Sequence, residues 1–151
     1  MNKENNEQFW KYFDSLENRR LKLTDIERMA DGNKKELAGV AHSYRKWLRI
    51  VDKKIHVRNT LHSCGLCKSF DKSDHCLSCP LKLEVASCGA YGNPWFEISE
   101  IMWSAFSCWT GLKRRDFTKS EQRSLEILSR KMLNTIKKCC SKYYGISFKN
   151  R

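Results

Sequence analysis

The chain has 151 residues, of which 40% are hydrophobic and 30% charged, with two prolines and seven glycines. This length and composition fit one globular domain and exclude a disordered or low-complexity chain. The net charge of +12 favours a polyanionic or acidic partner for part of the surface.

Two helices are predicted before residue 36. The first runs from about Asn6 to Arg20, because three apolar side chains recur there at helical spacing, namely Phe9, Phe13 and Leu16. The second opens at the capping box Thr24-Asp25-Ile26-Glu27 and is short, because Gly32 stops it.

The third predicted helix has the clearest pattern in the chain. Its apolar stripe at i, i+3, i+4, i+7 spacing comprises Leu37, Val40, Ala41, Tyr44, Leu48, Val51 and Ile55. A second stripe lies beside and behind the buried face and is expected to face outward. It contains Arg45, Arg49, Lys53 and His56. Residues 1–60 are therefore predicted to be helical.

Five cysteines and a histidine follow within residues 64–88. Their order is Cys64-x2-Cys67-x8-Cys76-x2-Cys79-x8-Cys88, with His75 beside Cys76. Each Cys-x-x-Cys pair is a tight turn that presents two sulfurs on one side, so two pairs supply the ligands of a tetrahedral zinc site. The polar, acidic N-terminus predicts no secretory signal, and a reducing cytoplasm favours metal over disulfides. Residues 61–93 are therefore predicted to form an inserted metal knuckle.

The choice of four ligands stays open at this point. The minimal set is Cys64, Cys67, Cys76 and Cys79, with Cys88 and His75 as alternates, and Cys64, Cys67, Cys79 and Cys88 form a competing set. Four thiolates leave no open position for water, which predicts a structural zinc and not a catalytic one. An iron–sulfur cluster also takes four cysteines, but the ferredoxin spacing is absent.

The same segment carries a resemblance to known proteins. It reads Cys64-Gly-Leu-Cys67, then His-Cys76-Leu-Ser-Cys79-Pro80-Leu81, then Cys88 and Pro94-Trp95. This order resembles a Cys-rich segment of small uncharacterised bacteriophage proteins, in which two Cys-x-x-Cys pairs, a further Cys and a Pro before an aromatic follow one another. The match covers about a fifth of the chain. It implies a phage-encoded metal knuckle and carries no assigned activity.

Two long helices are predicted in residues 94–145. Asn93 and Pro94 supply an N-cap and a first-turn proline for a helix to about Lys113, which is apolar nearly all round and therefore central to the core. The capping box at Thr118–Glu121 starts the last helix, and Gly145 ends it. We therefore predict a mainly α, single-domain chain over residues 1–151, with the knuckle inserted between its helices.

Basic side chains form the second group of candidate functional residues. The whole charge excess lies in residues 37–151, and residues 127–151 hold seven Lys or Arg and no acid. Cations spaced along a rigid helix can track phosphates. The candidates for contact with DNA or RNA are Arg45, Arg49, Lys53, Arg114, Arg115, Arg130, Lys137 and Lys138.

The leading hypothesis is a zinc-stabilised basic protein that binds nucleic acid without a sequence-specific reading motif. No finger, RNP or Gly-x-x-Gly pattern is present. The alternative is a small phage-like interaction protein or inhibitor whose basic face binds an acidic surface of a host protein. A plain solvated helix face is the third interpretation of each stripe.

No particular enzyme is predicted. The four histidines are too scattered for a catalytic set, and no P-loop, dinucleotide fingerprint or nucleophile elbow occurs. A nuclease built around His75 is the weakest of the alternatives. The longest apolar stretch, residues 95–112, contains Glu97 and Glu100 and is at the short limit for a membrane span, so a buried helix is expected there.

Overall fold

The computed structural model describes residues 3–22, 24–31, 35–54, 56, 92–107 and 112–149. Over these ranges the chain is mainly helical and contains α1 (Lys3–Ser15), α2 (Thr24–Ala30), α3 (Lys35–Val51), α6 (Pro94–Ala105) and α7 (Lys119–Tyr144). The predicted mainly α fold is confirmed for this part of the chain. The predicted metal knuckle, with Cys64, Cys67, Cys76, Cys79, Cys88 and His75, lies outside the described residues.

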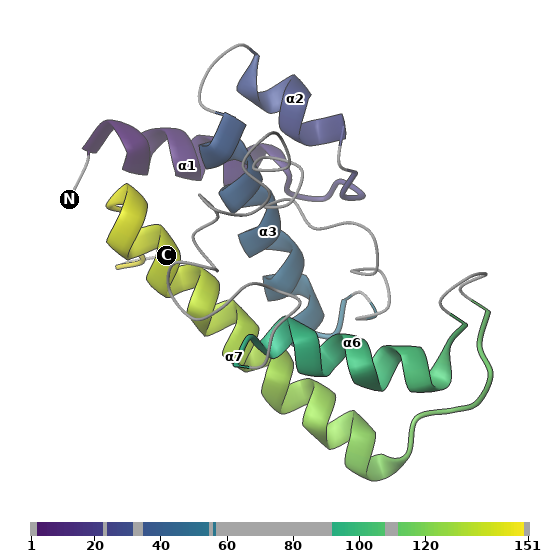
Figure 1. The fold of residues 1–151 in the computed structure, drawn as a ribbon. Coiled ribbons are helices and arrows are strands. Elements are labelled where there is room, and N and C mark those ends of the chain that lie inside the picture. The colour runs from purple at the N-terminus through teal and green to yellow at the C-terminus, as the bar shows by residue number, and fades with distance from the viewer. Residues whose placement is uncertain are drawn as a thin grey trace, which may run out of the picture.

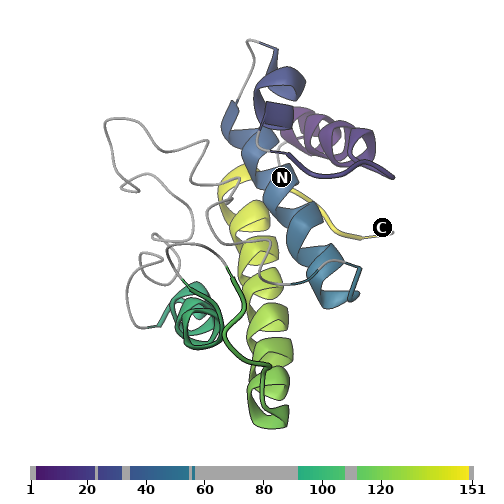
Figure 2. The same cartoon turned by 90° about the vertical axis from the view of Figure 1, so that its right-hand side faces the viewer.

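Helices α3 and α7 organise the fold. Helix α3 packs against α1, α2 and α7, and α7 also packs against α6 (Figure 1). Figure 2 shows α6 almost end-on at one side of α7, with α3 on the other side. Within the described ranges, no helix is long and apolar enough to cross a membrane.

The predicted caps of the last two helices are confirmed. Asn93 accepts a hydrogen bond from the Trp95 backbone N–H at 2.9 Å and precedes Pro94 at the start of α6. Thr118 and Glu121 exchange both hydrogen bonds of a capping box at the start of α7. Gly145 closes α7 with φ at 66°, in the left-handed region that glycine adopts without a steric penalty.

Helix α6 ends earlier than the sequence pattern indicates. It stops at Ala105, not near Lys113, because Phe106 turns to an extended conformation and pairs with Lys113 in an antiparallel bridge. The Ser107 N–H donates to Leu112 O at 2.8 Å, and the Arg114 N–H donates to Ala105 O at 2.7 Å. The expected helix to Lys113 is therefore wrong, since the chain folds back on the end of α6.

The C-terminal segment packs against α1. The Trp10 indole donates to Ser147 O at 3.1 Å, and the Ser147 N–H donates to the Asn6 side chain at 2.8 Å. The Phe148 ring lies 5.5 Å from the Trp10 ring and 5.1 Å from the Tyr44 ring on α3. Aromatic packing thus joins both ends of the described chain to α3.

His42 is buried on α3 and holds the segment that precedes α2. Its side chain is 1% exposed, and Nε2 lies 3.1 Å from Lys22 O. A carbonyl only accepts, so Nε2 carries the proton, while Nδ1 is buried without a hydrogen-bond partner. Burial, followed by the charge of Lys46, lowers the pKa of His42 to about 4.

This buried imidazole predicts a loss of stability in acid. The unfolded chain binds a proton near pH 6.5, whereas folded His42 binds one only near pH 4. Protonation therefore favours the unfolded state, and on the order of 3 kcal/mol of stability is lost as pH falls through this window. Urea unfolding at pH 7, 5.5 and 4.5 measures the loss. The control is His42→Gln, which can still donate to Lys22 O but does not titrate. If the free energy of unfolding falls equally with pH in the wild type and in His42→Gln, His42 is not the group responsible.

Candidate functional site

The structure distributes the predicted basic residues over three places. Arg45 and Arg49 lie against the end of α1. Lys53, Arg115 and Arg130 lie around two adjoining hollows between the end of α3 and the first half of α7. The remaining three, Arg114, Lys137 and Lys138, line neither hollow. The eight residues therefore do not form one surface.

Arg45 and Arg49 bind backbone carbonyls at the end of α1. Arg45 Nη2 donates to Phe13 O at 2.8 Å, and the guanidinium carbon lies 3.6 Å from the centroid of the Phe13 ring. Arg49 donates to Leu16 O at 2.7 Å and to Arg19 O at 2.6 Å. Phe13 O and Leu16 O each also accept one backbone N–H, so the guanidinium groups use the second lone pair of these oxygens. They also neutralise the partial negative charge at the end of α1.

The expectation that this stripe faces outward is therefore wrong for Arg45 and Arg49. Both side chains are half-buried, and burial, followed by the charge of Arg49, lowers the pKa of the Arg45 guanidinium. Two arginines that are already bonded to the protein backbone are poor candidates for phosphate contact. Their observed role is to attach α1 to α3.

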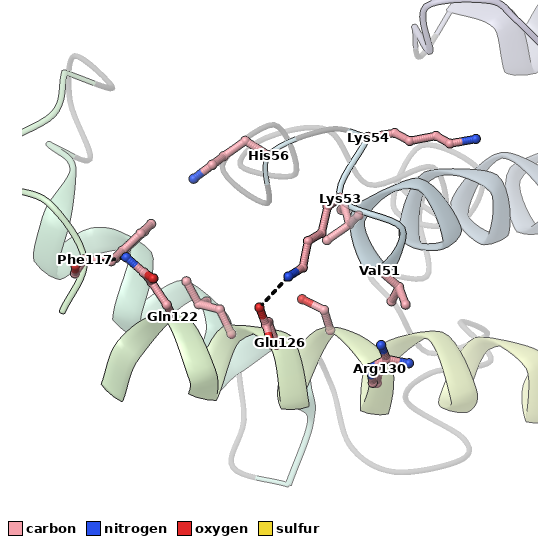
Figure 3. A pocket seen from close by; sticks show the side chains of 11 residues that line it. Val51, Lys53, Lys54, His56, Phe117, Gln122, Glu126 and Arg130 are labelled. Carbon is pink, nitrogen blue, oxygen red and sulfur yellow. Dashed lines mark hydrogen bonds and ion pairs between the residues drawn. The ribbon is translucent and has the colours of Figure 1, made fainter. Parts of the chain in front are cut away.

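The first hollow has a volume of about 440 Å³ and lies between the C-terminal end of α3 and α7 (Figure 3). Its apolar floor includes Ile50, Val51 and Leu125. Its polar lining comprises Lys53, Lys54, His56, Gln122, Glu126, Ser129 and Arg130. Lys53 and Arg130 from the predicted set therefore lie at the same hollow, although 77 residues separate them in the sequence.

One ion pair crosses this hollow. Lys53 Nζ lies 3.0 Å from Glu126 Oε1, which Figure 3 shows as a dashed line. The hydrogen bond from Lys53 lowers the pKa of Glu126, so this carboxylate stays ionised. Lys54 also lines the hollow, but its amine extends away from the pair (Figure 3).

The backbone at Lys53 is strained. Its φ is 59°, a left-handed conformation that costs a residue with a Cβ about 1 kcal/mol or more. The Lys54 N–H donates to Arg49 O at 2.8 Å, which is the long hydrogen bond of a Schellman turn at the end of α3. Glycine is the usual residue at this position. A lysine here places a cation at the mouth of the hollow in spite of the backbone cost.

A second hollow of about 790 Å³ adjoins the first. The two share His56, Phe117 and Gln122, and the second is also lined by Phe106, Lys113, Arg115, Asp116 and Lys119. The His56 and Phe117 rings are nearly parallel, with an interplanar angle of 7° and centroids 5.9 Å apart. We refer to the two hollows together as the α3–α7 cleft.

The carboxylates near the second hollow are bound to cations. Arg115 donates to both oxygens of Glu121, at 2.7 and 2.9 Å, and to Ser104 Oγ at 2.9 Å. The hydrogen bond from Arg115 is the largest cause that lowers the pKa of Glu121, to about 2. Asp116 forms an ion pair with Lys113. Arg115 is thus fixed in place, and Lys119 adds a cation to the rim.

The remaining predicted residues lie elsewhere. Arg114 is exposed, and its backbone N–H belongs to the turn after α6. Lys137 Nζ lies 5.2 Å from the centroid of the Phe148 ring, about 10 Å along α7 from Arg130. Lys138 is exposed on the same half of α7. None of the three lines the α3–α7 cleft.

Several cleft residues were absent from the predicted site. Lys54 and Lys113 adjoin the predicted cations Lys53 and Arg114 in the sequence. Lys119 is the first residue of α7, and its place beside the capping Thr118 could have suggested it. Phe117 and Gln122 had no usable signal, because a single aromatic between two helices has no periodicity. Only the fold brings them against the end of α3.

Metal ligation cannot be assigned to the described part of the chain. Within its ranges, no three His, Cys, Asp or Glu side chains are placed to hold an ion. Cys139 and Cys140 are buried thiols, and burial raises the pKa of Cys140 well above its ordinary value. Such a thiol is unreactive.

Comparisons with known protein families, with curated proteins and with solved structures found no match for this chain. The resemblance of the cysteine segment to bacteriophage proteins therefore stays a prediction.

The two roles of the arginines can be separated by stability measurements. Arg49→Gln removes a charged donor from two carbonyls, and we expect the free energy of unfolding to fall by about 1–2 kcal/mol. Arg130→Gln removes an exposed charge, and we expect a change within about 0.5 kcal/mol. Urea denaturation of both variants measures this difference. Equal stabilities would show that Arg49 does not hold the end of α1.

Proposed function

We propose that this protein binds nucleic acid through the α3–α7 cleft, without a sequence-specific reading motif. The observation that carries the proposal is the convergence of cations from three separate segments, around Lys53, Lys113 and Arg130, on one hollowed surface. Phosphate contacts by Lys and Arg supply most of the affinity in such binding.

The composition of the cleft favours backbone contact. Lys53, Lys54, Lys113 and Lys119 outnumber Arg115 and Arg130 among its cations. Lysine acts as a point charge, whereas bidentate recognition of guanine needs a free arginine fork. Arg115 already uses its fork on Glu121. Binding should therefore depend strongly on salt, with about three to five phosphates neutralised and a log–log slope of about −2 to −4.

An acidic surface of a host protein is the alternative partner. It would meet the same cations but would not need a hollow that reaches inward to Phe117. An acidic protein and a nucleic acid are distinguished by direct titration, so the alternative is an outcome of the same experiment.

Charge substitutions one helical turn apart test the proposed cleft. Arg130→Gln removes a cation from the hollow, and we expect the affinity for a labelled oligonucleotide to fall roughly fivefold, about 1 kcal/mol. Glu126→Gln removes the carboxylate that repels phosphate, and we expect the affinity to rise about threefold. Fluorescence anisotropy at several salt concentrations measures both.

The matched control is Lys142→Gln, which changes the net charge equally but lies about 18 Å along α7 from Arg130. It should leave the affinity nearly unchanged. If Lys142→Gln and Arg130→Gln weaken binding equally, the protein acts through its net charge and not through the cleft. If no oligonucleotide binds at about 0.1 M salt, nucleic-acid binding is contradicted and an acidic protein becomes the proposed partner.

We also propose that the cysteines of residues 64–88 bind one structural zinc ion. The proposal is supported by the two Cys-x-x-Cys pairs, with Cys88 and His75 as further donors. The segment that contains them connects His56 at the cleft with Asn93 at the cap of α6. Zinc binding would therefore contribute to holding the end of α3, which lines the cleft, and the start of α6 together.

The metal proposal predicts one zinc per chain by elemental analysis of the purified protein. The double variant Cys64→Ser/Cys67→Ser should lose the metal and unfold at lower temperature, since structural zinc contributes folding free energy directly. Cys139→Ala, which removes a buried thiol of α7, should retain the metal. A metal-free wild-type protein, or iron in place of zinc, would contradict this proposal.

A further inference from the structure

Aromatic rings lie at the centre of the cleft, among its cations. Phe117 and His56 lie where the two hollows meet, and both face the rim of cations. Phe106 is buried beneath them and contacts both rings edge-on, with centroids 5.7 Å from Phe117 and 6.3 Å from His56. The buried ring holds Phe117 in a fixed orientation, and Phe117 is itself half-buried.

We infer that the α3–α7 cleft takes single-stranded nucleic acid and stacks one unpaired base on Phe117, beneath His56. This inference rests on the proposed function and names its substrate class. Stacking on an aromatic side chain is sequence-tolerant, because every base has a π-face. It therefore agrees with the absence of a base-reading motif in the sequence.

The orientation of the rings suits this role. The His56 and Phe117 centroids are 5.9 Å apart with almost parallel planes. A base that enters between these planes would lie flat on Phe117, which is held by Phe106, and His56 would move to admit it.

The polar groups on either side fit a strand that passes across the rings. Lys53 and Arg130 flank the pair in the first hollow, and Lys113 and Lys119 flank it in the second. Phosphates on both sides of a stacked base would each meet cations. Gln122 lies in the wall that the hollows share, and Figure 3 shows its amide beside Phe117. The amide nitrogen donates to Phe117 O at 3.4 Å, so its second N–H and its oxygen are the groups that can bond to the edge of a stacked base.

A duplex cannot use this arrangement. Its bases are stacked on one another inside the helix and present only their edges in the grooves. A stacking platform at the bottom of a hollow reaches a base only when that base is unpaired. The first hollow, at about 440 Å³, is in the size range of small-ligand sites and can hold a single nucleotide.

The inference is tested with three labelled probes of equal length: a single strand, the matching duplex, and a single strand with abasic sites that keeps its phosphates. We expect the wild-type protein to bind the intact single strand about tenfold more tightly than the other two probes. If the duplex or the abasic strand binds as tightly as the intact strand, base stacking is overturned and the proposed phosphate binding survives. If no probe binds, the proposed function fails with it.

Substitutions of the platform give the second part of the test. Phe117→Leu keeps an apolar side chain over Phe106 but removes the π-face, and we expect affinity for the intact strand to fall about tenfold with an unchanged salt slope. Phe117→Trp enlarges the π-face and should bind the intact strand at least as tightly as the wild type. Affinity for the abasic strand should not change in either variant.

Arg130→Gln serves as the contrasting variant, because it should weaken binding to all three probes. Circular dichroism checks that each variant is folded. If Phe117→Leu does not fold, the Phe117→Trp variant and the comparison of the three probes on the wild-type protein still test base stacking. Equal losses on the intact and abasic strands in a folded Phe117→Leu variant would overturn the stacking role.

Discussion

Backbone carbonyls from the last turn of α1 to the segment before α2 accept hydrogen bonds from side chains of α3. Phe13, Leu16, Arg19 and Lys22 present these carbonyls at intervals of three residues, and they accept from Arg45, Arg49 and His42. Three of these oxygens, those of Phe13, Leu16 and Lys22, also accept a backbone N–H, so the side-chain donors use their second lone pair. This set of bonds fixes α1 and the α2 segment on α3. The remaining structure follows, because α3 then packs its apolar stripe against α7 and delivers its C-terminal end to the cleft.

The sequence predicted features whose chemistry is local. Asn93, Thr118, Glu121 and Gly145 were identified because a cap depends on residues only a few positions apart. The end of α6 was missed, because the apolar residues continue past Ala105 and the bridge from Phe106 to Lys113 is a tertiary choice. Arg49 and Lys53 looked alike for a similar reason. Periodicity places both on a polar stripe but cannot show that one bonds to the backbone and the other to a carboxylate.

The cleft combines an excess of cations with a few carboxylates that hold them. Lys53 is paired with Glu126, Arg115 with Glu121 and Lys113 with Asp116. These pairs reduce the repulsion among cations that the fold has brought together, and their strength at an exposed surface is modest. A phosphate can therefore displace a carboxylate from a lysine at small cost. Arg115 differs, because two parallel hydrogen bonds and the cap of α7 depend on its partner Glu121.

At Lys53 the stability of the fold and the charge of the cleft favour different residues, because the backbone there is left-handed. Glycine would relieve the conformational penalty at the end of α3, and it would remove the cation that faces Glu126. Selection for thermostability alone should therefore favour glycine at position 53. That substitution would remove one cation from the cleft. In a directed-evolution experiment, position 53 would report which of the two properties the selection had rewarded.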